Sequence, residues 1–302
     1  MGRKQPPGAP PPPAVQKLRL RYTKRGRLRF TSHRDIARVF ERALRRAQVP
    51  MAYSAGFSPH PKVSWIGAAA TGVASEAEYV EISLAERRDP EQLRVALDAA
   101  LPDGIDLVEA VEAPVGTSLP DRVQASAWSI RVPEVTRADL EVAVEAFLAA
   151  ELVEVERKTK DGLRHFDARA PVVSLWVSSD EAVTSVEAGA PTAGAPVPGA
   201  TLLPETASPI IACAILRVVV RHVTPAVRPD DILAGLRSVS DLVMPVPPAA
   251  TRLAQGPLTA NGEVADPLAP DRVVAGQPGA NGTGATRQVD EVVGAQPDLS
   301  VG

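Results

Sequence analysis

The strongest constraint on the fold of this chain is an order of short amphipathic segments that occurs twice along the sequence. In several runs apolar and polar residues alternate with a period of two, as in half-buried strands, and other runs have the 3.6-residue period of a helix. These runs are too short to build a doubly wound parallel sheet. The sequence therefore predicts an α+β protein whose short strands and helices pack as layers.

The first set of segments begins with a basic hairpin. Apolar side chains at positions 18, 20 and 22 alternate with Lys and Arg, Lys24-Arg25-Gly26 offers a turn, and the alternation resumes at 28–30. A helix is expected from residue 33, because Ser32 and Asp35 have the spacing of a capping box and apolar residues recur on one helical face after them. Strands at 49–54 and 79–84, a helix at 91–101 and a strand at 104–111 complete this set.

The second set repeats the order with an added hairpin. It is predicted to contain a strand at 127–132, a helix from Thr136 to residue 150, a hairpin at 152–159 and 163–166, strands at 172–177 and 210–222, a helix at 228–236 and an edge strand at 248–258. This order has the split β-α-β signature of a ferredoxin-like sandwich. We therefore expect two tandem ferredoxin-like units at 16–115 and 116–258, with a long loop at 179–209 inside the second. The proline-rich arm at 1–15 and the tail at 259–302 are expected to be disordered.

Charge is divided unequally between the two ends of the chain. Residues 1–62 hold 15 Lys and Arg residues and two acids, a balance of +13, whereas the remaining 240 residues hold 18 bases and 34 acids, a balance of −16. Such asymmetry suggests a surface for a polyanion, an acidic partner, or pairing between the two halves. Composition does not choose among these three.

The chain has one cysteine, Cys213, which excludes an internal disulfide and a Cys-rich zinc or iron–sulfur site. Because it lies in an apolar strand, we expect an inert core thiol. No run approaches 18 apolar residues, and the proline-rich N-terminus lacks the apolar stretch of a signal peptide. These features predict a cytoplasmic protein with no membrane span.

The most unusual local sequence is Tyr53-Ser-Ala-Gly-Phe-Ser-Pro-His-Pro-Lys62, in which Gly56 permits a bend and two prolines present His60. Two carboxylates follow at Glu76 and Glu78, and His33 lies in the first helical turn, where backbone N–H groups favour an anion. The candidate ligand- or anion-binding residues are His33, Arg34, Gly56, Phe57, His60, Lys62, Glu76 and Glu78. Electrostatic support is expected from Arg19, Arg21, Arg38 and Arg42.

Each of these residues also has a purely structural explanation. Ser32 and Asp35 are accounted for as helix caps, His60 as a turn residue, and the carboxylates as partners of nearby arginines. A metal site assembled from His33, His60 and a carboxylate has no i, i+4 histidine pair or HExxH pattern to support it, so no metal is predicted.

The basic residues of the predicted hairpin would project from the sheet face opposite the helices, which is the face that meets RNA in RNA-binding domains of this class. That face offers mainly guanidinium groups, with Tyr79 as its one expected ring. Any RNA contact there should be dominated by phosphates. The alternative is that this face packs against the acidic half of the chain.

Four runs carry a resemblance to a known family: Phe30-Thr-Ser-His-Arg-Asp35, Phe40-Glu-Arg-Ala-Leu-Arg-Arg-Ala47, the run from Tyr53 to Lys62, and Ser75-Glu-Ala-Glu-Tyr79. Together they resemble the radical-SAM-linked family of uncharacterised bacterial proteins. The resemblance implies a partner module for a radical S-adenosylmethionine enzyme. Because this chain lacks the Cys-x-x-x-Cys-x-x-Cys loop, S-adenosylmethionine and the iron–sulfur cluster are expected only in that partner.

The leading hypothesis is therefore an accessory protein, not an enzyme on its own, that binds RNA, a ribonucleoprotein or another anion and presents it to a separately encoded radical SAM protein. One alternative is a small enzyme in which His60 acts as acid–base and Glu76 or Glu78 orients it. Another is a scaffold that contacts only protein.

Overall fold

The computed structural model describes residues 11–114, 116–160, 162–179 and 213–275 and shows an α+β protein with a largely β-sheet core. The first set of elements is β1 (Gln16–Lys24), η1 (Gly26–Phe30), α1 (His33–Arg46), β2 (Val63–Ile66), β3 (Ala74–Leu84), α2 (Pro90–Asp98) and β4 (Leu107–Glu112). After η2 (Pro120–Arg122) come β5 (Ala125–Pro133), α3 (Arg137–Ala149), β6 (Glu154–Thr159), β7 (Gly162–Asp167), β8 (Val172–Val177), β9 (Cys213–Arg221), α4 (Pro229–Val239) and β10 (Ala249–Gly256). The last element is α5 (Ala269–Ala275).

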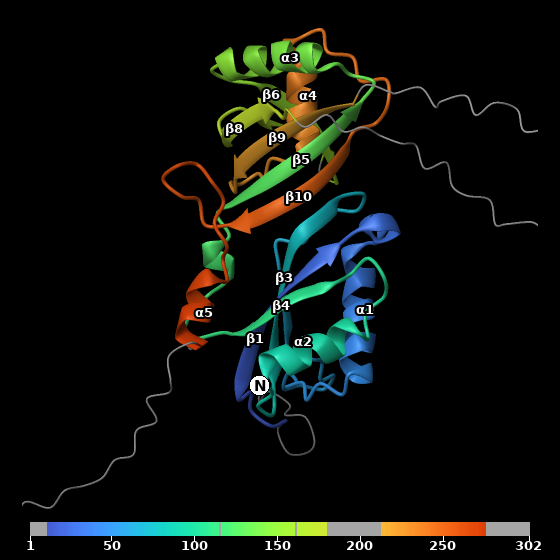
Figure 1. Cartoon of the computed structure of the whole chain (residues 1–302), viewed down its shortest axis with the longest axis vertical. Helices are drawn as coiled ribbons and strands as arrows, with labels where there is room; N and C mark the ends of the chain where they lie inside the picture. Colours follow the sequence, from blue (N-terminus) through green and yellow to red (C-terminus); the bar gives the residue numbers. More distant parts are fainter. Residues whose placement is uncertain (1–10, 115, 161, 180–212, 276–302) are drawn as a thin grey trace, which may run out of the picture.

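One sheet runs through both sets of elements (Figure 1). Its strand order is β4-β1-β3-β10-β5-β9-β8, and β2 pairs with β3 beside this path. The two halves join where β3 and β10 pair in parallel, with Ala74 opposite Thr251 and Ser75 opposite Arg252. The other strand pairs of the sheet are antiparallel.

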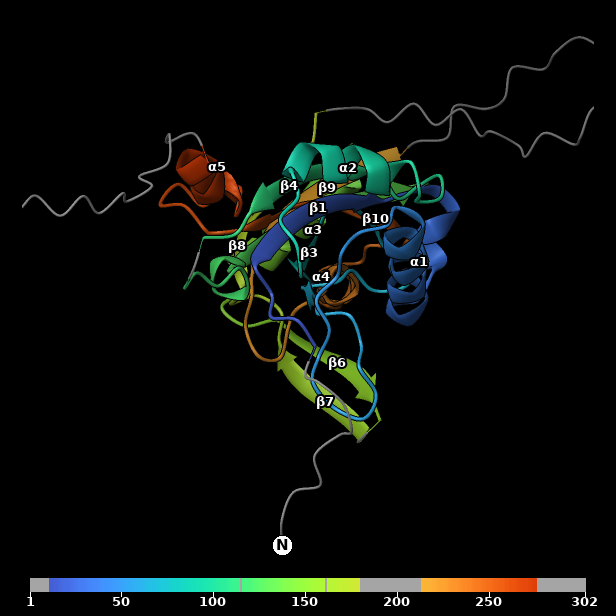
Figure 2. The ribbon, with the colours of Figure 1, turned by 90° about the horizontal axis from the view of Figure 1, so that it is seen from below.

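The two halves share one arrangement. In the first, β1-α1-β2-β3-α2-β4 gives the sheet order β4-β1-β3-β2. In the second, β5-α3-β8-β9-α4-β10 gives the order β10-β5-β9-β8. The second half also contains the hairpin β6-β7 between α3 and β8, which forms a separate two-stranded sheet and projects from the body in Figure 2.

The helices of the first half form because the sequence supplies caps and one apolar face. Ser32 accepts a hydrogen bond from the backbone N–H of Asp35 at the start of α1, and Asp89 caps α2 in the same way. The apolar face of α1, which includes Ile36 and Phe40, packs with buried residues of β1. This packing puts the arginines of α1 on its outer side.

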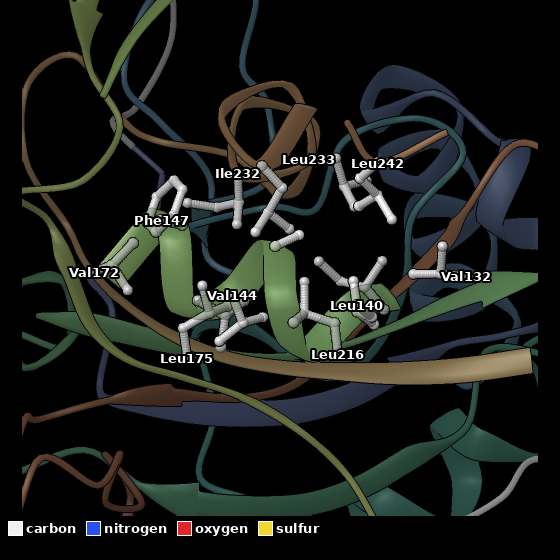
Figure 3. Packing of buried hydrophobic residues seen from close by; sticks show 14 of the residues in the cluster. Val132, Leu140, Val144, Phe147, Val172, Leu175, Leu216, Ile232, Leu233 and Leu242 are labelled. Carbon is white, nitrogen blue, oxygen red and sulfur yellow. The ribbon is translucent and has the colours of Figure 1, made fainter. Parts of the chain in front are cut away.

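The second half has its own core between α3, α4 and the sheet (Figure 3). Phe147 of α3 and Ile232 of α4 are fully buried and lie over Leu216 of β9. The two helices approach closely at Gly235, where a Cβ atom would lie 2.8 Å from the ring of Phe147. A glycine is needed there because the space is already filled.

Three sequence predictions about local structure are wrong. Residues 26–30 form the 3-10 turn η1 and not a second hairpin strand, since Leu28 and Thr31 donate backbone hydrogen bonds to residues three positions earlier. At 49–54 there are only isolated bridges, from Met51 to Leu84 and from Tyr53 to Pro61. The strand β2 lies between the strands predicted at 49–54 and 79–84, in an irregular stretch for which no strand was predicted.

The predicted tail is also wrong for residues 259–275, which belong to the folded protein. α5 lies against β4. Leu268, just before α5, is 0% exposed, and Asp271, within α5, is 1% exposed. Most of the predicted arm (1–10), the loop (180–209) and the rest of the tail (276–302) lie outside the described residues.

None of the helices in the described part of the chain has the length and apolar character needed to cross a bilayer.

The close approach at Gly235 gives a test of the second core. Gly235→Ala is expected to lower the free energy of unfolding by about 1–3 kcal/mol through overpacking, although alanine favours a helix by about 1 kcal/mol. Urea unfolding measures the change. Arg237→Ala, an exposed control in the same helix, should stay within about 0.5 kcal/mol of the wild type. Equal stability of Gly235→Ala and the wild type would contradict this packing.

Candidate anion-binding site

The loop predicted to present His60 is closed by its own hydrogen bonds. The backbone N–H of Ser54 donates to the His60 carbonyl at 2.9 Å, and the N–H of His60 donates to Ser54 Oγ at 3.1 Å. Ser54 Oγ also lies 3.0 Å from His60 Nδ1, so this ring nitrogen already has a partner. Gly56, with φ of +147°, lies in this loop, and Phe57 is 68% exposed. Lys62 is exposed at the end of the loop.

The two carboxylates predicted to accompany His60 lie elsewhere. Glu76 pairs with Arg25, and Glu78 is 1% exposed and accepts a hydrogen bond from Arg252 at 3.2 Å. Neither carboxylate contacts His60 among the described residues. The structure therefore gives no support to the prediction that a carboxylate orients this histidine.

The sheet face predicted to be basic and open is closed around Arg19. The side chain of Arg19 is fully buried and donates to both carboxylate oxygens of Asp271, at 2.9 and 2.8 Å. It also donates to Glu81 at 2.9 Å and to the carbonyl and hydroxyl oxygens of Thr117, both at 3.0 Å. The expectation that Arg19 supports a ligand from the surface is therefore wrong.

The segment that covers this face consists of residues 266–272, which we call the C-terminal strap. Leu268 of the strap packs with Tyr79, Val111 and Leu119 in a small cluster on this side of the sheet. Burial is the main cause of the raised pKa of Tyr79. Tyr79 is therefore not an exposed ring on which a base could stack.

Charged contacts secure the strap at both of its ends. Arg122 donates to Asp271 at 2.9 Å and to the Pro267 carbonyl at 2.8 Å. Arg272 pairs with Asp266 of the strap and with Glu109 of β4. Arg21, on the same strand as Arg19, is half-buried and donates to the backbone carbonyl of Glu76 at 3.1 Å.

The outer side of α1 differs from the sheet face around Arg19, because most of its basic side chains are exposed and form no ion pair with a described residue. Arg34, Arg42 and Arg45 form no ion pair with any described residue. Arg38 pairs with Asp35 at 3.2 Å, and hydrogen bonds from Ser32 and then the charge of Arg38 lower the pKa of the Asp35 carboxyl. We call Arg34, Arg38, Arg42 and Arg45 the α1 arginine stripe. Its members are spaced along one side of the helix.

His33 begins α1 and is exposed, with its ring edge-on to Trp65 of β2 at a centroid distance of 5.3 Å. The structure thus places His33 and Arg34 together at the N-terminal end of α1. No hydrogen bond or ring contact joins His33 to His60 within the described residues.

A buried charged cluster lies where the two halves meet, and no pattern in the sequence indicated it. Arg252 of β10 lies 4.9 Å from the Trp128 ring centroid and donates to Glu78, which also accepts from the backbone N–H of Ala69 at 2.9 Å. Burial lowers the pKa of Lys24, and burial with the nearby Glu78 charge raises the pKa of Tyr22. These groups come from β1, β3 and β10, so only the folded sheet brings them together.

No group of three or more His, Cys, Asp or Glu side chains among the described residues is arranged to hold a metal ion. Cys213 is partly buried at the start of β9. What the described surface offers chemically is a set of exposed guanidinium groups and imidazoles, which bind anions.

Residues 17–229 match the family described as "Uncharacterized protein conserved in bacteria (DUF2344)". The match covers more than half of the chain, so this protein belongs to that family. Comparison with curated proteins finds no match.

The strap gives a prediction about stability. Asp271→Ala removes the buried carboxylate that pairs with the buried Arg19 and the partly buried Arg122, and it should lower the free energy of unfolding by about 3–5 kcal/mol. Asp266→Ala, which removes a partly exposed carboxylate of the same strap, should cost about 1 kcal/mol or less. Urea unfolding of both variants measures the difference. A loss of less than about 1 kcal/mol for Asp271→Ala would show that the buried pair does not hold the strap.

Proposed function

We propose that this protein is a cytoplasmic accessory protein that binds RNA through the α1 arginine stripe and acts with a separately encoded radical SAM enzyme. The stripe supplies charge to RNA phosphates, and the neighbouring His33 lies at its N-terminal end. Phosphate contacts of this kind position a nucleic acid without reading its sequence. The proposed role is therefore to hold an RNA substrate for chemistry carried out by the partner.

The observation that carries this proposal is that three of the four arginines of the α1 arginine stripe have no carboxylate partner among the described residues. Arg34, Arg42 and Arg45 have no ion pair with a described residue, and no Asp or Glu occurs between Glu41 and Glu76. Several exposed arginines elsewhere in the first half do have acidic partners, as in the pairs Arg87–Glu112 and Arg88–Glu86. Unpaired arginines gathered on one helix face favour binding of a polyanion.

The fold argues for α1 over the sheet face as the RNA surface. Each half has the strand order expected of a ferredoxin-like unit, and we infer two tandem units of that class. In RNA-binding domains of this class the open sheet face meets the RNA. Here the C-terminal strap covers that face around Arg19 and Tyr79 in the first half. Lys17, which stays exposed on that face, lies 3.8 Å from the Glu81 carboxylate, whereas arginines on the helix side are exposed without an ion pair to a described residue.

The proposed radical SAM partner rests on the sequence resemblance and on cysteine content. The four resembling runs include residues 30–35 and 40–47, which contain part of the α1 arginine stripe. With Cys213 as its one cysteine, the chain cannot supply the three thiolates of a radical SAM cluster loop. The cluster and S-adenosylmethionine are accordingly assigned to the partner.

The acid–base alternative has no comparable support, because Nδ1 of His60 contacts Ser54 and both candidate carboxylates have arginine partners. The protein-only scaffold is distinguished by experiment, since such a scaffold has no affinity for RNA at low salt.

RNA binding across a salt series tests the proposal. The wild type should bind single-stranded RNA more weakly as salt rises, with a linear relation between log K and log salt. Replacing Arg34, Arg42 and Arg45 by Gln should reduce the magnitude of that slope by about 2, because each lost phosphate contact on a single strand contributes about 0.7. Fluorescence anisotropy with a labelled oligonucleotide measures both quantities.

A matched variant controls for net charge. Arg164, Arg221 and Arg237 are exposed arginines of the second half, and their replacement by Gln removes the same three charges. This control should keep the wild-type slope. Equal losses in the two triple variants would show that binding follows total charge and not the stripe, and absence of wild-type binding at low salt would remove the proposal.

A further inference from the structure

Phe30 is an aromatic residue whose exposure the fold does not explain. It follows an alternating run that predicts a core-facing side chain, yet it ends the 3-10 turn η1 and is 60% exposed. No residue of η1 is buried. Its exposure leaves the face of an aromatic ring available to a ligand.

The backbone that carries Phe30 is well fixed. The N–H of Thr31 donates to the Leu28 carbonyl at 3.0 Å, and the carbonyl of Arg29 accepts from the N–H of Gly72 at 2.7 Å. The guanidinium carbon of Arg29 lies 4.6 Å from the centroid of the Phe30 ring. The Arg29 guanidinium therefore lies over one face of the ring and helps to hold it in place, so a ligand would stack on the other face. Because the ring is already ordered, binding costs little further conformational entropy.

Basic residues precede and follow Phe30 in the sequence, and those that follow include the first two residues of α1. Arg27 and Arg34 are exposed and form no ion pair with a described residue, and His33 is exposed. In Figure 1 the blue segment after β1 curls at the start of α1. Phe30 precedes the first residue of α1 by three positions and Arg34 by four, so it lies near the N-terminal end of the α1 arginine stripe.

We propose that Phe30 is a stacking platform for a nucleobase and that the ligand of the stripe is single-stranded RNA. Arg27 and Arg34 bind phosphates on either side of the stacked base, and the strand continues along α1. An unpaired strand can turn a base out onto a protein ring without breaking a base pair, whereas a duplex must first lose pairing and stacking within its helix. This inference rests on the proposed RNA-binding function and specifies its substrate class.

A second exposed ring provides a control. Trp176 is 47% exposed on β8 of the second half. It lies at the far edge of the sheet from the strands of the first half, and it belongs to neither α1 nor η1. Trp176→Ala thus removes an exposed ring without altering the proposed platform.

The test compares a ten-nucleotide oligouridine with an RNA duplex of the same length. Phe30→Ala should weaken binding of the single strand by roughly tenfold, since stacking on a ring contributes about that much per base, and should leave duplex binding unchanged. Trp176→Ala should bind the single strand like the wild type. Because Phe30 is exposed, its alanine variant should also keep the wild-type unfolding midpoint.

A tryptophan at position 30 gives a direct readout of stacking. Phe30→Trp should bind at least as well as the wild type, and the single strand should quench its fluorescence beyond the quenching seen for the native tryptophans in the wild type. The duplex should produce no such additional quenching.

Several results would overturn the inference while the proposed function stands. These are wild-type affinity of Phe30→Ala for the single strand, equal weakening for strand and duplex, or no added quenching of Phe30→Trp. Failure of the wild type to bind either RNA at low salt would instead overturn both proposals.

Discussion

The contact between Arg19 and Asp271 determines which surfaces of this protein are open. All three nitrogens of the Arg19 guanidinium have acceptors, supplied by Glu81, Asp271 and Thr117. A guanidinium with every donor used inside the protein has none to offer a ligand. The same contact fixes the C-terminal strap over the first half, so the face that the charge pattern marked as basic is closed by the chain itself.

The basic side chains of the N-terminal segment thus fall into two groups in the folded protein. Some of the N-terminal cations are neutralised internally, as Arg19 is by the strap and Arg25 is by Glu76 and Asp106. Others, on α1, remain exposed without partners. Where the halves meet, Arg252 and Glu78 pair in the buried cluster beside the parallel contact of β3 and β10, and this joins the two similar units into one sheet.

Sequence patterns predicted those helices and strands whose caps and apolar periodicity lie within the element itself. The Ser32 cap and the apolar stripe after it located α1, and the apolar run at 172–177 matches β8. The alternation at 27–30 was misleading because a run of four residues fits a 3-10 turn as well as a strand. For the site, the pattern found the arginines of α1, but burial of Arg19 depends on a partner 252 residues away. No local pattern reveals such a partner, and sequence proximity likewise wrongly grouped Glu78 with His60.

The central claim is that RNA meets the protein on α1 and η1 and not on the sheet face beneath the strap. Photo-crosslinking with an oligonucleotide that contains 4-thiouridine, followed by mass spectrometry of the crosslinked peptides, tests it most directly. The account predicts crosslinks within residues 27–45. Crosslinks concentrated in β1 and β3, at residues 17–21 and 79–83, would show that the strap leaves the sheet face in solution and would contradict it.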